Sequence, residues 1–190
     1  MSHMVDSLVV ADASTRIIEL LQDDDDGVFD DVLRVLLEAL RSPLGFCGYI
    51  DSNGDLVCAS MTGGVFDACR VNGKSIRFPK SVWGGVWGQV LIERQPKFKN
   101  APHSVPPGHL AIQRSLGVPL LFRDELVGAI HVANREYDYG DADSLLLQQI
   151  ARPIAPVLHS RLTHRRSVEH AAADLAAQAR RIAESEHSRV

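Results

Sequence analysis

Three cysteines are the first residues of this sequence to consider for chemistry, because a thiolate is both a nucleophile and a metal ligand. Cys47, Cys58 and Cys69 form no Cys-x-x-Cys pair, and any disulfide scheme leaves one of them unpaired. A reactive cysteine needs a nearby cation to lower the pKa of its thiol, and only Arg70 flanks any of the three. We therefore expect buried, inert thiols in a protein of the reducing cytoplasm.

Three histidines, His103, His109 and His131, are the candidates for holding a metal or a haem before the C-terminal helical region. They lack ligand-type spacing such as His-x3-His, so we predict no metal site. Four consecutive aspartates, Asp23 to Asp26, are the candidates for calcium. Calcium loops place oxygens at alternate positions around a glycine, whereas adjacent carboxylates repel one another. The run is predicted to be a solvated turn whose last aspartate helps to start the next helix.

Both tryptophans lie in the stretch SVWGGVWGQVL, four residues apart and interleaved with three glycines. A helix from Ser81 to about Glu93 would place Trp83, Trp87 and Leu91 on one face. Three glycines inside a helix cost it roughly 2 to 3 kcal/mol relative to alanine, so close approach to a sheet or a ligand must offset them. The tryptophans are predicted either to line a ligand pocket or to belong to an ordinary core.

Composition narrows the class of protein further. The 190 residues suit one domain with an appendage, and 20 basic against 24 acidic side chains give a net charge of −4. Such a chain lacks the basic surface typical of nucleic-acid binding, and no apolar run approaches the roughly 20 residues that span a bilayer. The sequence contains no Gly-x-Ser-x-Gly elbow and no phosphate-binding glycine loop. We expect a cytoplasmic binding module rather than an enzyme, with no nucleic-acid or membrane partner.

The elements that position these residues begin with helices predicted over 13–22 and 28–40. The second helix carries an apolar stripe suited to covering a sheet. Two hairpins follow, one turning at Asn53-Gly54 and one at Arg123 to Glu125, with loop at 65–69 and a short strand at 75–78 between them. Pro119 in the second hairpin predicts an edge position or a bulge. The stripe of the second helix comprises Val32, Leu33, Leu36, Leu37 and Leu40.

From Asp141 the chain is predicted to be helical almost to its end, interrupted only at Pro153 and Pro156. Its last 30 residues would form a helix about 45 Å long, too long to pack against one domain along its full length. We expect it to pair with a second copy as a coiled coil, with a solitary charged helix as the alternative. Arg161 and Arg165 in the seam would weaken the pairing and keep it switchable. The seam comprises Ile154, Leu158, Arg161, Arg165, Val168, Ala172, Leu175, Ala179 and Ile182.

The order of these elements resembles the GAF domain, a small-molecule sensor module, over roughly residues 28 to 162. The stretch LVGAIHVAN at 126–134 looks like the final GAF strand, YGDAD at 139–143 like the start of its last helix, and Val118-Pro-Leu120 like a strand opening. The stretches 78–91 and 105–109 resemble a subtype found in bacterial and archaeal multidomain sensor kinases. The resemblance implies an α+β fold, with a GAF-like antiparallel β-sheet flanked by helices and a long C-terminal signalling helix.

In the GAF fold the tryptophan-bearing helix flanks the ligand cavity, so the resemblance implies a pocket for an unidentified small molecule. The cyclic-nucleotide motif is altered here to Asn134-Arg135, Tyr139 and Asp143-Ser144, and it is expected to be structural, with an asparagine cap and an Arg–Asp pair. No cysteine precedes a histidine, as bilin attachment would need. The predicted pocket residues are Tyr49, Cys58, Met61, Trp83, Trp87, Leu91 and Ile112, with His109 or Arg114 as a polar anchor.

The stretch 179–189 resembles the helical segment that precedes PAS domains in sensor kinases, so the chain looks like a piece of a longer protein. The expected parts are an N-terminal segment (1–27), a GAF domain (28–162) and a coiled-coil linker (163–190). We expect an intracellular sensory module that signals through a dimeric helix to an output such as a histidine kinase of a two-component system. The alternatives are a structural dimerisation module, and a thiol enzyme of the free-methionine-sulfoxide-reductase type that uses Cys58 or Cys69.

Overall fold

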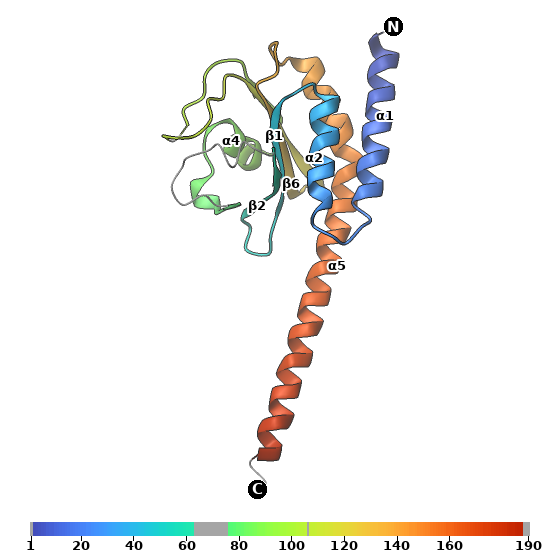
Figure 1. Ribbon diagram of the computed structural model, residues 1–190, viewed down its shortest axis with the longest axis vertical. Helices are drawn as coiled ribbons and strands as arrows, with labels where there is room; N and C mark the ends of the chain where they lie inside the picture. The colour runs from blue at the N-terminus through green and yellow to red at the C-terminus, as the bar shows by residue number, and fades with distance from the viewer. Residues whose placement is uncertain (1, 63–75, 106, 188–190) are drawn as a thin grey trace.

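The computed structural model describes residues 2–62, 76–105 and 107–187. One face of a six-stranded antiparallel sheet is covered by α2 (Val28–Ala39) and the first part of α5 (Asp141–His187), and α1 (Ser2–Leu20) packs on these two helices. The opposite face carries α4 (Gly85–Glu93), as Figure 1 shows. This arrangement confirms the predicted α+β fold with a long C-terminal helix. No helix among the described residues is long and apolar enough to cross a membrane.

The sheet runs in the order β3-β2-β1-β6-β5-β4, so the two hairpins meet where β1 pairs with β6. Both predicted hairpins are confirmed, since β1 pairs with β2 and β5 pairs with β6. The predicted loop at 65–69 lies outside the described residues. The strands are β1 (Leu44–Ile50), β2 (Leu56–Met61), β3 (Arg77–Phe78), β4 (Lys97–Lys99), β5 (Ser115–Phe122) and β6 (Glu125–Ala133).

Each hairpin turn has a local reason for its geometry. In the first turn the Asp51 carboxylate accepts hydrogen bonds from the backbone N–H groups of Asn53 and Asp55, and Gly54 takes the positive φ of 81°. In the second turn Arg123 and Asp124 both adopt positive φ, at 49° and 65°. Two left-handed residues in a row give the backbone twist that suits a tight antiparallel hairpin.

Pro119 occupies a stretch of β5 that has a neighbour on one side only. It pairs with Ala129 of β6, whereas β4 on the other side pairs with β5 only over Ser115 to Gly117. A proline has no N–H to donate, so this locally unpaired edge accommodates it. The predicted edge position is confirmed, and the register shift follows at Leu120/Leu121.

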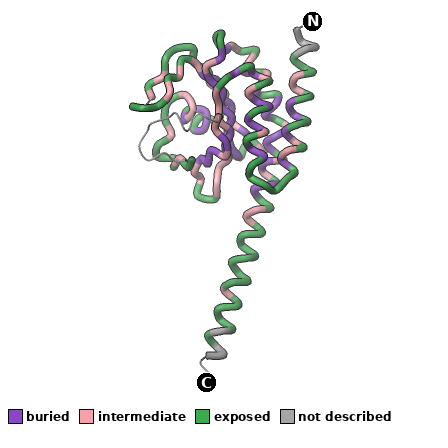
Figure 2. Tube along the Cα trace, viewed as in Figure 1, coloured by how far each residue is buried: buried purple, intermediate pink, exposed green. Residues whose placement is uncertain are grey.

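The main core lies between the sheet and the three helices on one face, shown as the purple band in Figure 2. Of the stripe predicted on α2, Val32, Leu33 and Leu36 are buried and Leu37 is half-buried. Leu40, just after the helix, is buried too. The amphipathic pattern therefore correctly predicted how α2 packs on the sheet.

The first helix is longer than predicted, since α1 begins at Ser2 rather than near Ala13. Ser14, near the expected start, lies within the helix and is buried, as are Ala13 and Ile17. Packing on α2 and α5 therefore centres on the part of α1 from Ala13 onward, and of residues 6–12 Val10 alone packs on the core.

The prolines do not interrupt the last helix, which corrects the prediction that they would. Pro153 and Pro156 both lie inside the continuous helix α5. A proline removes a backbone hydrogen bond, yet Ile150, Ile154 and Leu158 of the same stretch are buried against the sheet and its helices. Packing of this apolar face holds the helix together across both positions. Beyond Leu162, α5 leaves the domain and becomes exposed (Figures 1 and 2).

Candidate functional site

A second apolar cluster lies on the α4 side of the sheet, separate from the main core, and we call it the α4-side cluster. Its buried centre is small, while most of its aromatic members remain half-exposed. Five of the predicted pocket residues, Cys58, Met61, Trp83, Trp87 and Leu91, are brought together here. The cluster comprises Leu56, Cys58, Leu91 and Ala129, with Phe46, Ile50, Met61, Phe78, Trp83, Trp87 and Leu126 packed against them.

The tryptophan-bearing helix differs from the prediction in where it starts. A short 3-10 turn covers Lys80–Val82, Trp83 is extended, and α4 begins only at Gly85. Trp83 therefore does not share a helix face with Trp87 and Leu91. It joins the cluster from the preceding turn, where its indole N–H donates to the carbonyl oxygen of Phe78 at 3.0 Å.

Gly85 and Gly88 allow the backbone geometry at the start of α4. Gly85 has a φ of +60°, which side chains rarely adopt. A Cβ on Gly88 would lie 2.5 Å from the carbonyl carbon of Trp83. The chain thus folds Trp83 back over the first turn of α4, where Phe78 also meets Trp87 edge-on at 5.7 Å between ring centroids.

Tyr49 does not belong to the α4-side cluster, which corrects the predicted pocket. It lies on the opposite face of the sheet, against the main core, with its ring 6.0 Å from that of Phe29. Successive residues of a strand point to opposite faces, and Tyr49 pairs with Val57 rather than with Cys58. The sequence did not show this register because β1 shifts at Cys47/Gly48.

The predicted polar anchors His109 and Arg114 and the predicted pocket residue Ile112 are engaged elsewhere. His109 is exposed, and its ring Nδ1 lies 2.7 Å from the neighbouring carbonyl oxygen of Leu110. Ile112 is half-buried, and its carbonyl oxygen accepts a hydrogen bond from the backbone of His103. Arg114 donates to the carbonyl oxygens of Arg135 and Glu136 at 2.7 and 3.0 Å, and pairs with Asp138. None of these three is in the α4-side cluster.

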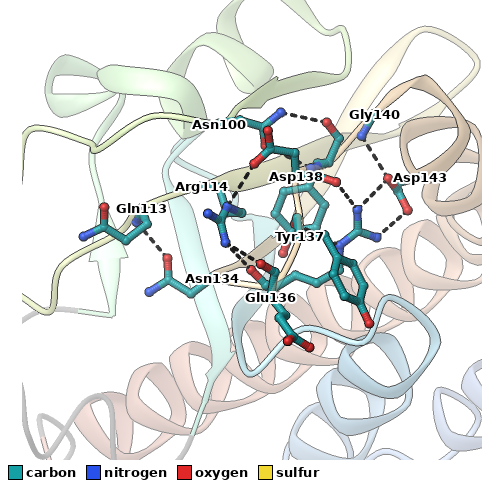
Figure 3. A network of polar contacts seen from close by, with 11 residues as sticks. Asn100, Gln113, Arg114, Asn134, Glu136, Tyr137, Asp138, Gly140 and Asp143 are labelled. Atoms are coloured by element: carbon teal, nitrogen blue, oxygen red, sulfur yellow. Dashed lines mark hydrogen bonds and ion pairs between the residues drawn. The ribbon is translucent and has the colours of Figure 1, made fainter.

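Arg114 is part of a polar network that fastens the β6–α5 connection, drawn in Figure 3. Arg135 pairs with Asp143 through two hydrogen bonds, of 2.5 and 2.8 Å, at the first turn of α5. Its guanidinium also lies 4.6 Å from the ring centroid of Tyr139. Asn134 does not cap a helix: its side chain bonds the backbone of Ala111 and Gln113. The predicted structural role of the Arg–Asp pair agrees with this geometry.

The charges of Arg135 and Asp143 stabilise this network. Burial alone would raise the pKa of the Asp143 carboxyl, but hydrogen bonds from Arg135 and the Gly140 backbone lower it below its usual range. The Asp143 hydrogen bond in turn raises the pKa of Arg135. Both groups stay charged at neutral pH, so the pair holds α5 against the end of β6.

Burial governs the chemistry of the cysteines. It raises the pKa of the Cys58 thiol to about 12 and that of Cys47 further still. Neither thiol ionises at neutral pH, so neither is a ready nucleophile. Cys69 lies outside the described residues. Among the residues described, no three His, Cys, Asp or Glu side chains gather in a group that could hold a metal ion.

His131 was considered only as a metal or haem candidate in the sequence and was not among the predicted pocket residues. It is 4 % exposed on β6, and its ring stacks on Phe46 of the α4-side cluster. Burial, and then the charge of His103, lower the pKa of His131 to about 3, so its imidazole is neutral. No spacing pattern identified it, because its place depends on the pairing of β6 with β1 and β5.

A crevice of about 250 Å³ lies where α5 leaves the domain, and Ile50 and Leu126 line it as well as belonging to the α4-side cluster. The β1–β2 turn, the start of β6 and α5 enclose it. His159 lies 3.4 Å from the Glu125 carboxylate at its edge, and Arg166 donates to the Ile50 carbonyl oxygen. These contacts tie the hairpin turns to the base of the projecting helix.

The seam predicted along α5 divides into three parts. Ile154 and Leu158 are buried in the domain core, and Val168, Leu175 and Ile182 are exposed on the projecting half. Arg161 and Arg165 between them bind within the same chain, which corrects their place in a coiled-coil seam. Arg161, buried, donates to the carbonyl oxygens of Leu21 and Asp25 and lies over the Phe29 ring.

Asp26 completes this contact, which we call the Asp26 clamp. Its carboxylate pairs with Arg161 at 3.4 Å and with Arg165, so the last aspartate of the acidic run binds α5. Burial opposes its ionisation, but Arg165 and then Arg161 lower the pKa of Asp26. The rest of the run is exposed, as predicted. The clamp fastens the α1–α2 connection to α5 where that helix leaves the domain.

Comparisons with known proteins now bear on this architecture. A methyl sulfide methyltransferase-associated sensor from Methanosarcina acetivorans is 29% identical over 127 residues, which are 58% of this chain and 12% of that protein. The chain thus spans about an eighth of this curated relative's length.

Solved structures share the fold. The GAF domain from an Acinetobacter phosphoenolpyruvate-protein phosphotransferase superposes with a TM-score of 0.60 at 17% identity, covering 85% of this chain and 97% of that one. Free methionine-R-sulfoxide reductase from Neisseria meningitidis superposes with a TM-score of 0.57 at 18% identity, covering 84% and 91%. The family model described as GAF domain matches residues 22–159, most of the chain. The protein is therefore a member of the GAF domain family.

Proposed function

We propose that this protein is a cytoplasmic sensory module that binds a small ligand at the α4-side cluster. It transmits the signal through α5, as a homodimer, to a downstream output domain such as a histidine kinase. The observation that carries the proposal is the set of half-exposed aromatic side chains opposite the helical face of the sheet. Its parts are a GAF domain over 28–162, an N-terminal segment before it and a linker helix over 163–190.

The α4-side cluster supports ligand binding through its unusual exposure. Phe46, Met61, Phe78, Trp83 and Trp87 pack on the cluster yet are all only half-buried. An aromatic cluster that leaves part of its surface accessible to solvent is a candidate interaction site. Apolar walls with few polar groups are the usual composition of a small-molecule site.

Signal transmission is supported by the projecting half of α5. Val168, Leu175 and Ile182 are exposed and lie seven residues apart, the heptad spacing of a coiled-coil seam. We propose a second copy of this helix as the partner that covers them. The Methanosarcina relative is named as a sensor, and its greater length leaves room for an output domain.

We assign no catalytic role to Cys58, although some structural neighbours are free methionine-R-sulfoxide reductases. That likeness reaches only 18% identity and concerns the fold. A peroxidatic or reductase cysteine needs a thiolate, and burial raises the pKa of Cys58 to about 12. A ligand-free relay domain is the other candidate, and the ligand test below separates it.

The ligand test combines native mass spectrometry of the purified protein with tryptophan fluorescence during addition of metabolite pools. We expect a retained mass, or a saturable change in emission that Trp83→Phe and Trp87→Phe each reduce. Tyr137→Phe alters an exposed aromatic side chain outside the α4-side cluster and is the matched control. It is expected to leave the response unchanged. An empty protein with an unresponsive emission would instead indicate a domain that relays signals without receiving them.

The dimer test uses sedimentation equilibrium of the full chain. Leu175→Glu places a charge in the proposed seam and is expected to dissociate the dimer. Ala173→Glu adds the same charge to the opposite side of the helix and serves as the control. Equal dissociation constants for the two variants would contradict the seam.

A further inference from the structure

His131 presents an unsatisfied polar atom inside an otherwise apolar region. Its Nε2 is buried and has no hydrogen-bond partner within residues 2–62, 76–105 and 107–187. Buried polar side-chain atoms in native proteins are almost always paired, because an unpaired one keeps the full cost of losing its water. Such an atom beside a partly exposed aromatic cluster lacks a partner among the described residues and is therefore a candidate contact for a bound molecule.

The sheet is built around this ring. His131 pairs with Phe46 of β1 on one side and with Gly117 of β5 on the other. Its ring stacks on Phe46 with centroids 4.8 Å apart and an interplanar angle of 17°. A Cβ on Gly117 would lie only 2.0 Å from Cε1 of His131. The missing side chain at position 117 therefore gives the imidazole its place.

The charge around His131 limits what it can recognise. The imidazole is neutral at neutral pH, since burial opposes its protonation. Lys97, which pairs with Gly117 in the sheet, forms an ion pair with Glu93 at 2.5 Å. His103 lies 3.3 Å from the Ser115 hydroxyl. With these two basic groups already engaged, the site offers hydrogen bonding and aromatic surface rather than a positive charge.

We propose that His131 is the polar contact through which the α4-side cluster recognises its ligand, a flat, uncharged molecule that carries a hydroxyl group. This inference rests on the proposed ligand-binding function. A hydroxyl both donates and accepts, so it satisfies Nε2 in either tautomer of a neutral imidazole. The flat shape matches the near-parallel Phe46 and His131 rings, and the lack of charge matches the neutral site.

Phenol and toluene are the probes for this contact, because they share size and shape and differ by a hydroxyl in place of a methyl group. Their dissociation constants are measured by heteronuclear NMR titration of the full chain. Replacing His131 by Phe is expected to reduce the preference for phenol over toluene by about five- to tenfold, the worth of one buried hydrogen bond. His131→Gln retains a hydrogen-bonding group and is expected to restore most of the preference. His103→Phe removes a neighbouring histidine and serves as the control.

The outcomes separate this inference from the proposed function. If both probes bind and their ratio is the same in wild type and His131→Phe, the inference is wrong while the ligand site stands. If neither probe binds, both fail. Should His131→Phe not fold, the side-chain ¹⁵N resonance of His131 in wild type decides the matter. Phenol but not toluene is expected to shift it, and equal responses overturn the assignment.

Discussion

Acidification between about pH 7 and pH 5 should destabilise this protein chiefly through His131. Burial lowers the pKa of the folded-state imidazole to about 3, whereas an unfolded histidine titrates near 6.5. Below about pH 6.5 the unfolded chain therefore binds a proton that the folded protein does not. The contribution of neutral His131 is complete above that pH and is lost as the pH falls toward 3.

The magnitude follows from the separation of the two pKa values. Each pKa unit corresponds to about 1.4 kcal/mol, so the whole window is worth on the order of 5 kcal/mol. Between about pH 7 and pH 5 the free energy of unfolding should fall by about 2 kcal/mol. That is a large share of the roughly 5 to 15 kcal/mol by which domains are stable.

Urea unfolding followed by tryptophan emission measures this loss at both pH values. His131→Phe should abolish most of the difference, because phenylalanine has no proton to bind. Burial also lowers the pKa of His103, which titrates in the same direction, so His103→Gln gives the size of that smaller share. The carboxyls of Asp26 and Asp143, with lowered pKa values, stay ionised throughout this range. An unchanged pH dependence in His131→Phe would refute the reasoning.

Three further substitutions test other parts of the fold. Arg161→Ala leaves the carbonyl oxygens of Leu21 and Asp25 without their hydrogen-bond donor, so it should lower the free energy of unfolding in urea by about 2 to 3 kcal/mol. Arg165→Ala removes only a partly exposed ion pair and should lower it by less than about 1 kcal/mol. Similar losses for both would show that the buried carbonyl contacts do not matter. Gly88→Ala should displace Trp83 and shift its emission, since the new Cβ meets the Trp83 backbone, while Gly84→Ala, with only a distant neighbour at 3.9 Å, should shift it far less. Arg135→Lys cannot keep both hydrogen bonds to Asp143 and should lower the free energy of unfolding by about 1 to 2 kcal/mol in thermal unfolding. A variant as stable as the wild type would argue against the bidentate pair.

Local patterns predicted the elements well wherever backbone chemistry decided them. The Asn-Gly turn and the stripe of α2 fixed a hairpin and a packing face from a few residues each. Pro119 likewise predicted an edge, because a missing N–H is a local property. The start of α1 was predicted too late: the helix begins at Ser2, although among residues 6–12 Val10 alone packs on the core.

The candidate site was less accessible to sequence reasoning because it depends on register and on long-range pairs. Tyr49 was assigned to the wrong face, since a shift in β1 changes which residue opposes Cys58. His131 was considered as a metal candidate but not as a pocket residue, because its neighbours Phe46 and Gly117, far apart in sequence, define its surroundings. Arg161 and Arg165 fitted a helical seam by spacing, yet the Asp26 carboxylate from the other end of the chain engages both.

The two outer strands of the sheet also limit how copies of this protein can associate. One edge ends in β3, two residues long, and the other in β4, three residues long. Arg77, Lys97 and Lys99 lie on these strands, and Arg77 and Lys97 form ion pairs with Asp51 and Glu93. Short edge strands that carry charged, ion-paired side chains offer a poor template for another chain to extend the sheet. Among the described strands, both ends of the sheet therefore resist strand-by-strand aggregation, which favours association through the helices.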